Sequence, residues 1–132
     1  MKRLYPVILK QHENVVLVRI PDLGINTEGK NMYDAIEMAR DAIGLQGICL
    51  EDDKLKIPEP SSFKKILTGD GEIKTLVDID YKEYRRKVDM KKIRKNVTIS
   101  SWLSKEAEQR GINFSHVLEK ALQEIIYAEE QE

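Results

Sequence analysis

The sequence has little cysteine, histidine or aromatic character and no long apolar run. Its 132 residues include one cysteine, two histidines and 6% aromatic residues. The single Cys49 cannot form an internal disulfide, which fits a reducing cytoplasm, and this residue set argues against a structural zinc site. No apolar run approaches the roughly 20 residues that span a bilayer, and the first residues lack the apolar core of a secretory signal. We therefore expect a cytoplasmic protein with no membrane partner, no metal site and no cofactor.

The formal net charge is only −1, but the charged residues are distributed unevenly along the sequence. Residues 1–80 contain eleven basic and fourteen acidic residues, a net charge of about −3. From Lys82 to Lys95, eight basic residues face two acidic ones, a net charge of about +6. This asymmetry predicts a two-part molecule, with a mildly acidic domain in residues 1–80, a basic linker in 81–90 and a second domain in 91–132.

The first domain is predicted to begin with a hairpin. The β-branched runs at residues 4–9 and 15–20 are separated by the polar stretch KQHEN, in which His12 is expected to lie in the turn. The irregular stretch PDLGINTEGK follows, and Ile25 with its neighbours predicts a short third strand.

A helix and a fourth strand complete this predicted domain. From Met32 the apolar residues repeat at helical spacing, and Asn31 is a suitable N-cap. We expect this helix to reach Leu45 and to continue toward Asp53, although Gly44 and Gly47 weaken it. Residues 73–79 form another strand-like run, so the order is β-β-β-α-β. The fold class is α+β, a small antiparallel sheet that carries one helix.

The stretch KKIRKNVTISSWL predicts a strand without an evident partner. Its side chains alternate over residues 93–99, and everything after it is typical of helices. Ser100 or Ser101 can cap a first helix that ends at Gly111, and Asn113 can cap a second. Two short helices and a half-apolar strand cannot close a core alone, and an isolated strand leaves unpaired backbone groups.

Pairing with a second copy of the chain would satisfy the backbone hydrogen-bonding groups of this strand. The same strand of another chain would lie antiparallel to it, and the four helices would cover the apolar face. The exposed face of such a two-stranded ribbon fits the DNA major groove, where Arg can bond a guanine edge, Asn can bond adenine, and Thr can bond a base or touch a thymine methyl. The start of the second helix offers free amides to a phosphate. The predicted base contacts are Arg94, Asn96 and Thr98, the phosphate contacts are Lys91, Lys92, Lys95, Asn113, Phe114 and Ser115, and the dimer core is Val97, Ile99, Leu103, Leu118 and Leu122.

Simpler interpretations of this stretch remain open. Arg94 can be a solvated surface charge, and residues 93–99 can form an extra edge strand of the first sheet. A helix-turn-helix is disfavoured, because Val97, Thr98 and Ile99 favour extended structure.

Two parts of the sequence carry a resemblance to known families. The stretch IRKNVTISSWLSKEAEQRGINFSHVLEKAL resembles the ribbon-helix-helix repressors. The stretch YPVIL…VVLVRIPDLGINTEGKNMYDAIEMARDAI resembles the HicB antitoxins, whose sheet is followed by a PDL-G-x-x-T-x-G loop and an Ala-rich helix. The proline that many relatives carry between Leu23 and Gly24 is missing, and a common Glu-Ala pair is Asp34-Ala35 here. Together the matches cover nearly the whole chain.

The resemblance implies both a fold and a function. It implies a partial RNase H-like N-terminal domain and a C-terminal ribbon-helix-helix domain that dimerises or forms a higher homo-oligomer. It also implies an antitoxin that neutralises a basic HicA-type mRNA interferase and represses its own operon by binding double-stranded operator DNA.

Two alternative functions stay open from the sequence. One is a stand-alone transcriptional repressor whose N-terminal domain senses a small ligand or another protein. The other is an RNase H-like nuclease, which would need converging carboxylates for two metal ions, with Asp22, Glu37, Asp78 and Asp80 as candidates. We expect no enzymatic activity. Asp22 lies in the Pro-Asp-Leu turn, where Asp often serves as a backbone cap, and Asp78 and Asp80 can simply be solvated. With 34% charged residues, nearby carboxylates also arise by chance.

Overall fold

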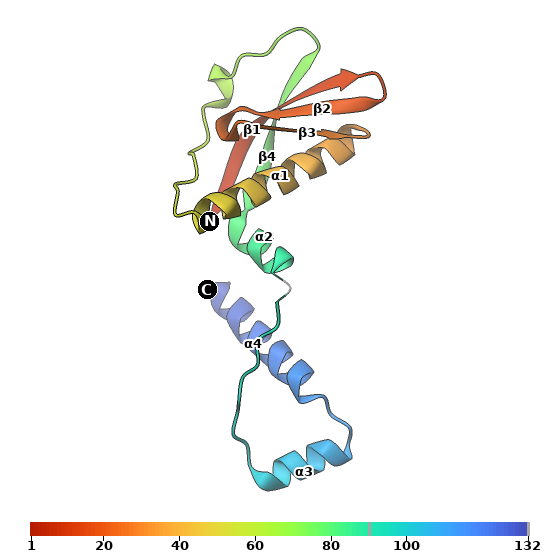
Figure 1. Cartoon of the computed structure of the whole chain (residues 1–132), viewed down its shortest axis with the longest axis vertical. Coiled ribbons are helices and arrows are strands. Elements are labelled where there is room, and N and C mark those ends of the chain that lie inside the picture. The colour runs from red at the N-terminus through yellow and green to blue at the C-terminus, as the bar shows by residue number, and fades with distance from the viewer. Residues whose placement is uncertain (90, 132) are drawn as a thin grey trace. The chain divides into compact units, whose positions relative to one another are not determined.

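The computed structural model describes residues 1–89 and 91–131, in two compact units (Figure 1). Unit 1 is Met1–Lys91 and unit 2 is Lys92–Glu132. Residue 90, the last of the predicted linker, and residue 132, the last of the predicted second domain, lie outside the described residues. The elements are β1 Lys2–His12, β2 Val15–Ile20, the 3₁₀ turn η1 Pro21–Leu23, β3 Ile25–Gly29, α1 Met32–Asp52, the 3₁₀ turn η2 Phe63–Lys65, β4 Glu72–Asp80, α2 Tyr81–Val88, α3 Ser101–Gln109 and α4 Phe114–Glu130.

Unit 1 is an antiparallel sheet of four strands in the order β3-β2-β1-β4, with α1 packed against it (Figure 1). Alternate residues of the strands face α1, and Tyr5, Val7 and Val18 are among the buried ones. On α1, Ala35, Ala39 and Ile43 recur every four residues and form the buried face. The predicted β-β-β-α-β order and the α+β class are confirmed.

The β1–β2 hairpin is tighter than the sequence predicts. Strand β1 continues to His12, which pairs with Val15, so the turn consists of residues 13 and 14 with Glu13 in the left-handed region at φ 55°. The placement of His12 in the turn was therefore wrong. Polar residues can extend a strand that is held by backbone pairing, and the Gln11 side-chain amide donates to the carbonyls of Glu13 and Val15.

Helix α1 begins and ends close to the predicted positions. Asn31 is the N-cap, and its Oδ1 accepts a hydrogen bond from the Asp34 amide at 2.8 Å. The helix continues to Asp52, through Gly44 and Gly47. Both glycines are buried, and the reason lies in the segment that follows β4.

The segment predicted as a basic linker is largely helical. Asp80 caps α2 by accepting hydrogen bonds from the amides of Lys82 and Glu83 at 3.1 and 3.4 Å. Tyr81 is buried, and its ring lies against Gly47. Residues 81–88 are therefore a helix of unit 1, because the Tyr81 ring is buried against α1 while Lys82, Glu83 and Lys87 stay exposed to solvent.

Unit 2 contains the two predicted helices. Gly111 follows α3 at φ 70°, and the amides of Gly111 and Ile112 donate to the carbonyls of Glu108 and Ala107, which is a Schellman ending. Asn113 caps α4 by accepting a hydrogen bond from the His116 amide at 3.0 Å. Ser100 occupies the N-cap position of α3 without a side-chain cap bond.

No helix within residues 1–89 and 91–131 is long and apolar enough to cross a membrane.

Candidate functional site

The ribbon segment, residues 91–100, forms neither helix nor strand in the single chain. All ten of its residues are exposed. The sheet of unit 1 consists of β1 to β4, so the interpretation of residues 93–99 as its extra edge strand was wrong. The predicted pairing with another chain stays a prediction, because its partner would be a second copy.

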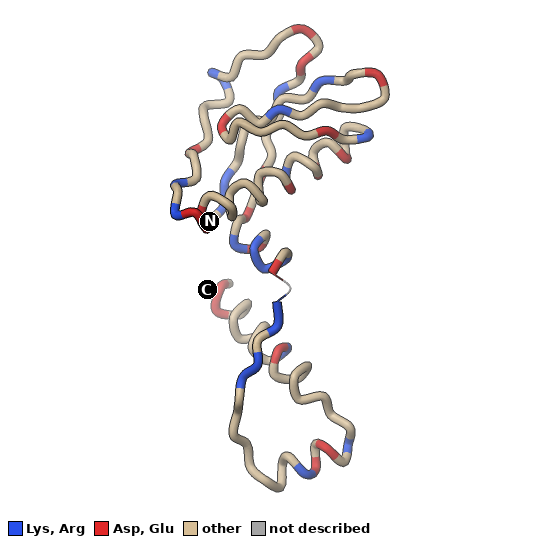
Figure 2. Tube along the Cα trace, viewed as in Figure 1, with Lys and Arg blue, Asp and Glu red and all other residues tan. Residues whose placement is uncertain are grey.

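The predicted DNA-contacting residues lie on this segment and at the start of α4. The predicted base contacts, Arg94, Asn96 and Thr98, are all exposed. Figure 2 shows that Lys and Arg follow one another closely through α2 and the ribbon segment. The predicted phosphate contacts lie in two places. Lys91, Lys92 and Lys95 are on the ribbon segment, and Asn113, Phe114 and Ser115 are at the N-terminus of α4.

Two of these predicted phosphate contacts already have partners in the chain. The Lys92 ammonium lies 2.9 Å from the Glu119 carboxylate, and this hydrogen bond lowers the pKa of Glu119. The Asn113 side chain is used as the cap of α4. Phe114 and Ser115 lie in the first turn of α4, where backbone amides have no acceptor within the helix.

The predicted dimer-core residues are exposed apolar side chains in the single chain. Val97 is 64% exposed, Ile99 46%, and Leu118 and Leu122 38% and 50%. Leu103 on α3 is 45% exposed. Exposure of this much apolar side-chain surface to water is unfavourable. We therefore expect another apolar surface to pack against these residues, because unit 2 of a single chain does not bury them.

A second feature, the contact between α1 and α2, was missed by the sequence analysis. The ring of Tyr84 lies against Gly44, and its hydroxyl donates to Asp41 at 2.9 Å. Burial and this hydrogen bond raise the pKa of Tyr84 to about 12. Arg85 lies 3.2 Å from Asp52. Two glycines one turn apart within a helix were the available signal, because glycine in a helix is unfavourable unless another element packs closely there.

The four carboxylates of the nuclease interpretation each bind a neighbour in the chain. Asp22 accepts hydrogen bonds from the amide and hydroxyl of Ser61, the former at 2.9 Å. Asp80 caps α2. Glu37 and Asp78 both bind Arg40, at 2.7 and 2.9 Å. Among the described residues, no three His, Cys, Asp or Glu side chains are placed to hold a metal ion.

Arg40 also changes the acidity of its partner. The hydrogen bond from its guanidinium lowers the pKa of Asp78, and the same bond raises the pKa of Arg40. Arg40 donates from Nε to the Asp78 carbonyl as well, so it binds both the backbone and the side chain of β4.

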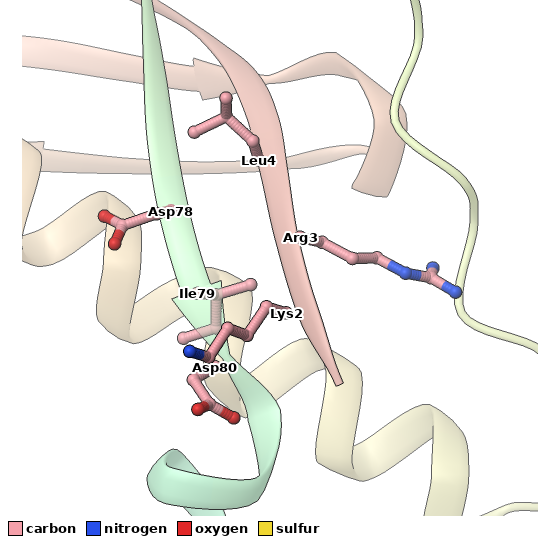
Figure 3. A pocket seen from close by; sticks show the side chains of 6 residues that line it. All are labelled: Lys2, Arg3, Leu4, Asp78, Ile79 and Asp80. Carbon is pink, nitrogen blue, oxygen red and sulfur yellow. The ribbon is translucent and has the colours of Figure 1, made fainter. Parts of the chain in front are cut away.

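An open hollow of about 550 Å³ lies over the ends of β1 and β4. Leu4, Lys2, Asp78 and Asp80 project to one side of these strands, whereas Arg3 points away toward the connection after α1 (Figure 3). Arg3 there donates to the carbonyls of Ile57 and Pro58 at 2.9 Å. The residues that line the hollow thus combine the apolar Leu4 and Ile79 with charges of both signs.

A family model spans both units of this chain. The model of the HicB-like antitoxin of bacterial toxin-antitoxin systems matches residues 5–121. The chain belongs to this family. A search of curated proteins gave no match.

Solved structures show the same fold as this HicB-like chain. A chain of a toxin-antitoxin complex from Streptococcus pneumoniae is 22% identical, with a TM-score of 0.60 over 94% of this chain and 99% of that one. The antitoxin HicB of Burkholderia pseudomallei is 22% identical, with a TM-score of 0.53 over 96% and 98%. A chain of the HicA3 and HicB3 toxin-antitoxin complex is 20% identical, with a TM-score of 0.51 over 58% and 98%.

Proposed function

We propose that this HicB-like chain neutralises a HicA-type mRNA interferase through unit 1 and represses its own operon through unit 2. The observation that carries the proposal is the family match, which extends from β1 into α4 and so covers both units. Two of the similar structures are toxin-antitoxin complexes, which supports a toxin as the partner. The excess of acidic residues in 1–80 would favour the encounter with a basic toxin.

The DNA-binding half of the proposal rests on the ribbon segment. The segment includes the basic residues Lys91, Lys92, Arg94 and Lys95, all of its residues are exposed, and its apolar side chains alternate with polar ones. We infer that two copies pair here as a ribbon-helix-helix dimer, with Arg94, Asn96 and Thr98 directed at base edges. Phosphate contacts from the flanking lysines would supply most of the affinity. Unit 1 would correspond to the partial RNase H-like domain.

Co-expression with the neighbouring genes tests the proposal directly. The chain would carry an affinity tag, and mass spectrometry would identify any partner and its ratio. We expect a small basic partner at a stoichiometric level that is toxic when expressed alone. Recovery of the chain without a partner, together with retained binding to its upstream DNA, would instead favour a stand-alone repressor. Divalent-metal-dependent RNA cleavage by the purified chain would favour the nuclease.

A further inference from the structure

Helix α2 brings a group of basic side chains to the surface of unit 1 that the capture of a toxin does not use. Its eight residues include four basic residues and one acidic residue. A basic toxin would be repelled there, because like charges across an interface are unfavourable. Figure 2 shows that these residues belong to the run of Lys and Arg that leads into the ribbon segment, which begins three residues after α2 ends.

The docking of α2 on α1 determines which of its side chains point outward. The rings of Tyr81 and Tyr84 lie against α1, and Arg85 lies 3.2 Å from the carboxylate of Asp52 on the same helix. At 3.6 residues per turn, these three residues of α2 occupy one side of it. The opposite side, which we call the α2 outer face, consists of Lys82, Glu83, Arg86 and Lys87.

The α2 outer face is accessible, positively charged and held in place. It has three basic residues and one acidic residue, a net charge of +2. Lys82, Glu83 and Lys87 are exposed, and Arg86 is half-buried and donates to the Glu83 carboxylate at 3.1 Å. Because the Tyr81 ring is buried, the face is fixed on unit 1 and is not part of a flexible linker. A fixed surface loses less conformational entropy on binding than a flexible one does.

The short connection to the ribbon segment keeps the α2 outer face close to any DNA that this segment binds. Lys87 and Arg94 are seven residues apart in the sequence, so their Cα atoms are at most about 25 Å apart even in a fully extended chain. One DNA strand carries a phosphate every 3.4 Å or so along the axis, so this limit corresponds to roughly seven base pairs. A tether this short gives the face an effective concentration on the order of millimolar toward the flanking phosphates.

We propose that the α2 outer face is a second DNA-binding surface, which contacts phosphates beside the bases that the ribbon segment reads. This inference rests on the DNA binding of the proposed function and extends the DNA contact into unit 1. Lys82 and Lys87 bind phosphate, and Glu83 opposes them by repelling phosphate and by holding Arg86. The surface adds affinity and salt dependence without sequence preference, because phosphates are the same on every sequence.

Titration of two operator duplexes at several salt concentrations tests this inference. The short duplex ends at the last base pair whose substitution changes binding, and the long duplex adds about ten base pairs, one turn of DNA, on each side. We expect the wild-type chain to bind the long duplex roughly tenfold more tightly at low salt. The slope of the log binding constant against log salt should be steeper by about two for each bound chain, since each phosphate contact contributes about 0.9. Equal affinities and slopes would overturn the inference.

A matched pair of double substitutions assigns this difference to α2. Lys82→Gln with Lys87→Gln should remove the preference for the long duplex and leave binding of the short duplex unchanged. Lys64→Gln with Lys65→Gln is the control, because it removes the same charge from exposed lysines of η2, which lies beside the middle of β4. The control should keep the preference. Equal losses in both would contradict the inference, and the urea midpoint of unit 1 verifies that both variants are folded.

Glu83→Gln gives a change of the opposite sign. It removes the negative charge from the α2 outer face and releases Arg86 from this ion pair. Binding of the long duplex should become roughly threefold tighter or more, whereas the short duplex should be bound as before. A disturbed helix would weaken binding, so an increase is specific to contact with phosphate. Unchanged or weaker binding of the long duplex would contradict the inference.

Sequence preference distinguishes failure of this inference from failure of the proposed function. If the wild-type chain binds its upstream DNA no better than a scrambled duplex, the DNA-binding half of the proposed function fails, and this inference fails with it. If the chain prefers its operator but binds the short and long duplexes equally, only the inference about α2 fails.

Discussion

The ring of Tyr81 lies directly against the backbone of Gly47, so closely that a Cβ on Gly47 would be 2.0 Å from Tyr81 Cε1. Tyr84 makes the corresponding contact with Gly44, where a Cβ would be 2.5 Å from Cδ2. The two glycines are one helical turn apart on α1, and the two tyrosines are one turn apart on α2. This matched spacing makes α2 a part of unit 1.

Gly47→Ala should destabilise unit 1 by about 1–3 kcal/mol, even though alanine favours helix. The methyl group would overlap the buried Tyr81 ring, which has to move and lose its packing. The midpoint of urea unfolding measures this effect. Gly69→Ala is the control, because a Cβ there would be 3.5 Å from the nearest atom, the Glu72 carboxylate oxygen, an ordinary contact. Equal midpoints for the two variants would show that α2 does not pack on α1 in solution.

The elements of unit 1 were predictable wherever the apolar pattern follows one clear period. The strands at 15–20 and 73–79 and the helix from Met32 are examples, because each has a buried face at strand or helix spacing. The helix α2 was not predictable in this way. Its burial rests on two tyrosines in a charged segment, and the glycines against which they pack are 34 and 40 residues away in sequence.

The candidate site of unit 2 could be predicted only as far as local pattern allows. The two helices and their caps at Gly111 and Asn113 depend on neighbouring residues, and the structure has them as predicted. The strand at residues 93–99 depends on pairing with another chain, so neither the sequence nor the fold of one chain determines it. Its base-reading residues therefore stay predictions.

Asp22→Ala should loosen the connection between α1 and β4 without unfolding unit 1. The Asp22 carboxylate accepts hydrogen bonds from the amide and the hydroxyl of Ser61, and it joins η1 to this connection. Loss of such bonds at an exposed site costs about 1 kcal/mol. Trypsin cleavage at Lys64 and Lys65 should become faster. Asp70→Ala, in the same connection, is the control, and equal cleavage rates for both variants would contradict the prediction.

Asp78→Asn should reduce the amount by which the unfolding free energy of unit 1 falls between neutral and acid pH. Arg40 lowers the pKa of Asp78 in the folded state, so the ion pair stabilises unit 1 fully above the unfolded pKa of about 4. This contribution is lost as pH falls through the lower folded pKa. The effect is small because both groups are partly exposed.

Urea midpoints from neutral to acid pH measure the effect of Asp78→Asn. The variant should be slightly less stable at neutral pH and should converge with the wild type in acid. Asp70→Asn, a carboxylate substitution in the connection before β4, should follow the wild type throughout. A constant difference between Asp78→Asn and wild type at all pH values would mean that the ion pair is not its cause.

Arg94→Ala and Lys95→Ala should weaken operator binding in different ways. Arg94 is predicted to bond a base edge, so its loss should cost about 1–3 kcal/mol on the operator and relax sequence preference at one position. Lys95 is predicted to contact phosphate, so its loss should weaken binding about equally on all DNA sequences. It should also reduce the slope of the log binding constant against log salt concentration by about one, because one counterion fewer is released.

Titrations of operator and scrambled duplexes at several salt concentrations separate these two roles. Both variants should still capture the toxin, because unit 1 is unchanged. If Arg94→Ala weakens both duplexes equally, Arg94 is a phosphate contact and the base-reading face of the ribbon has been assigned to the wrong side. If neither substitution changes DNA binding, the ribbon segment is not the DNA-binding surface. The proposal that unit 1 captures the toxin does not depend on this result.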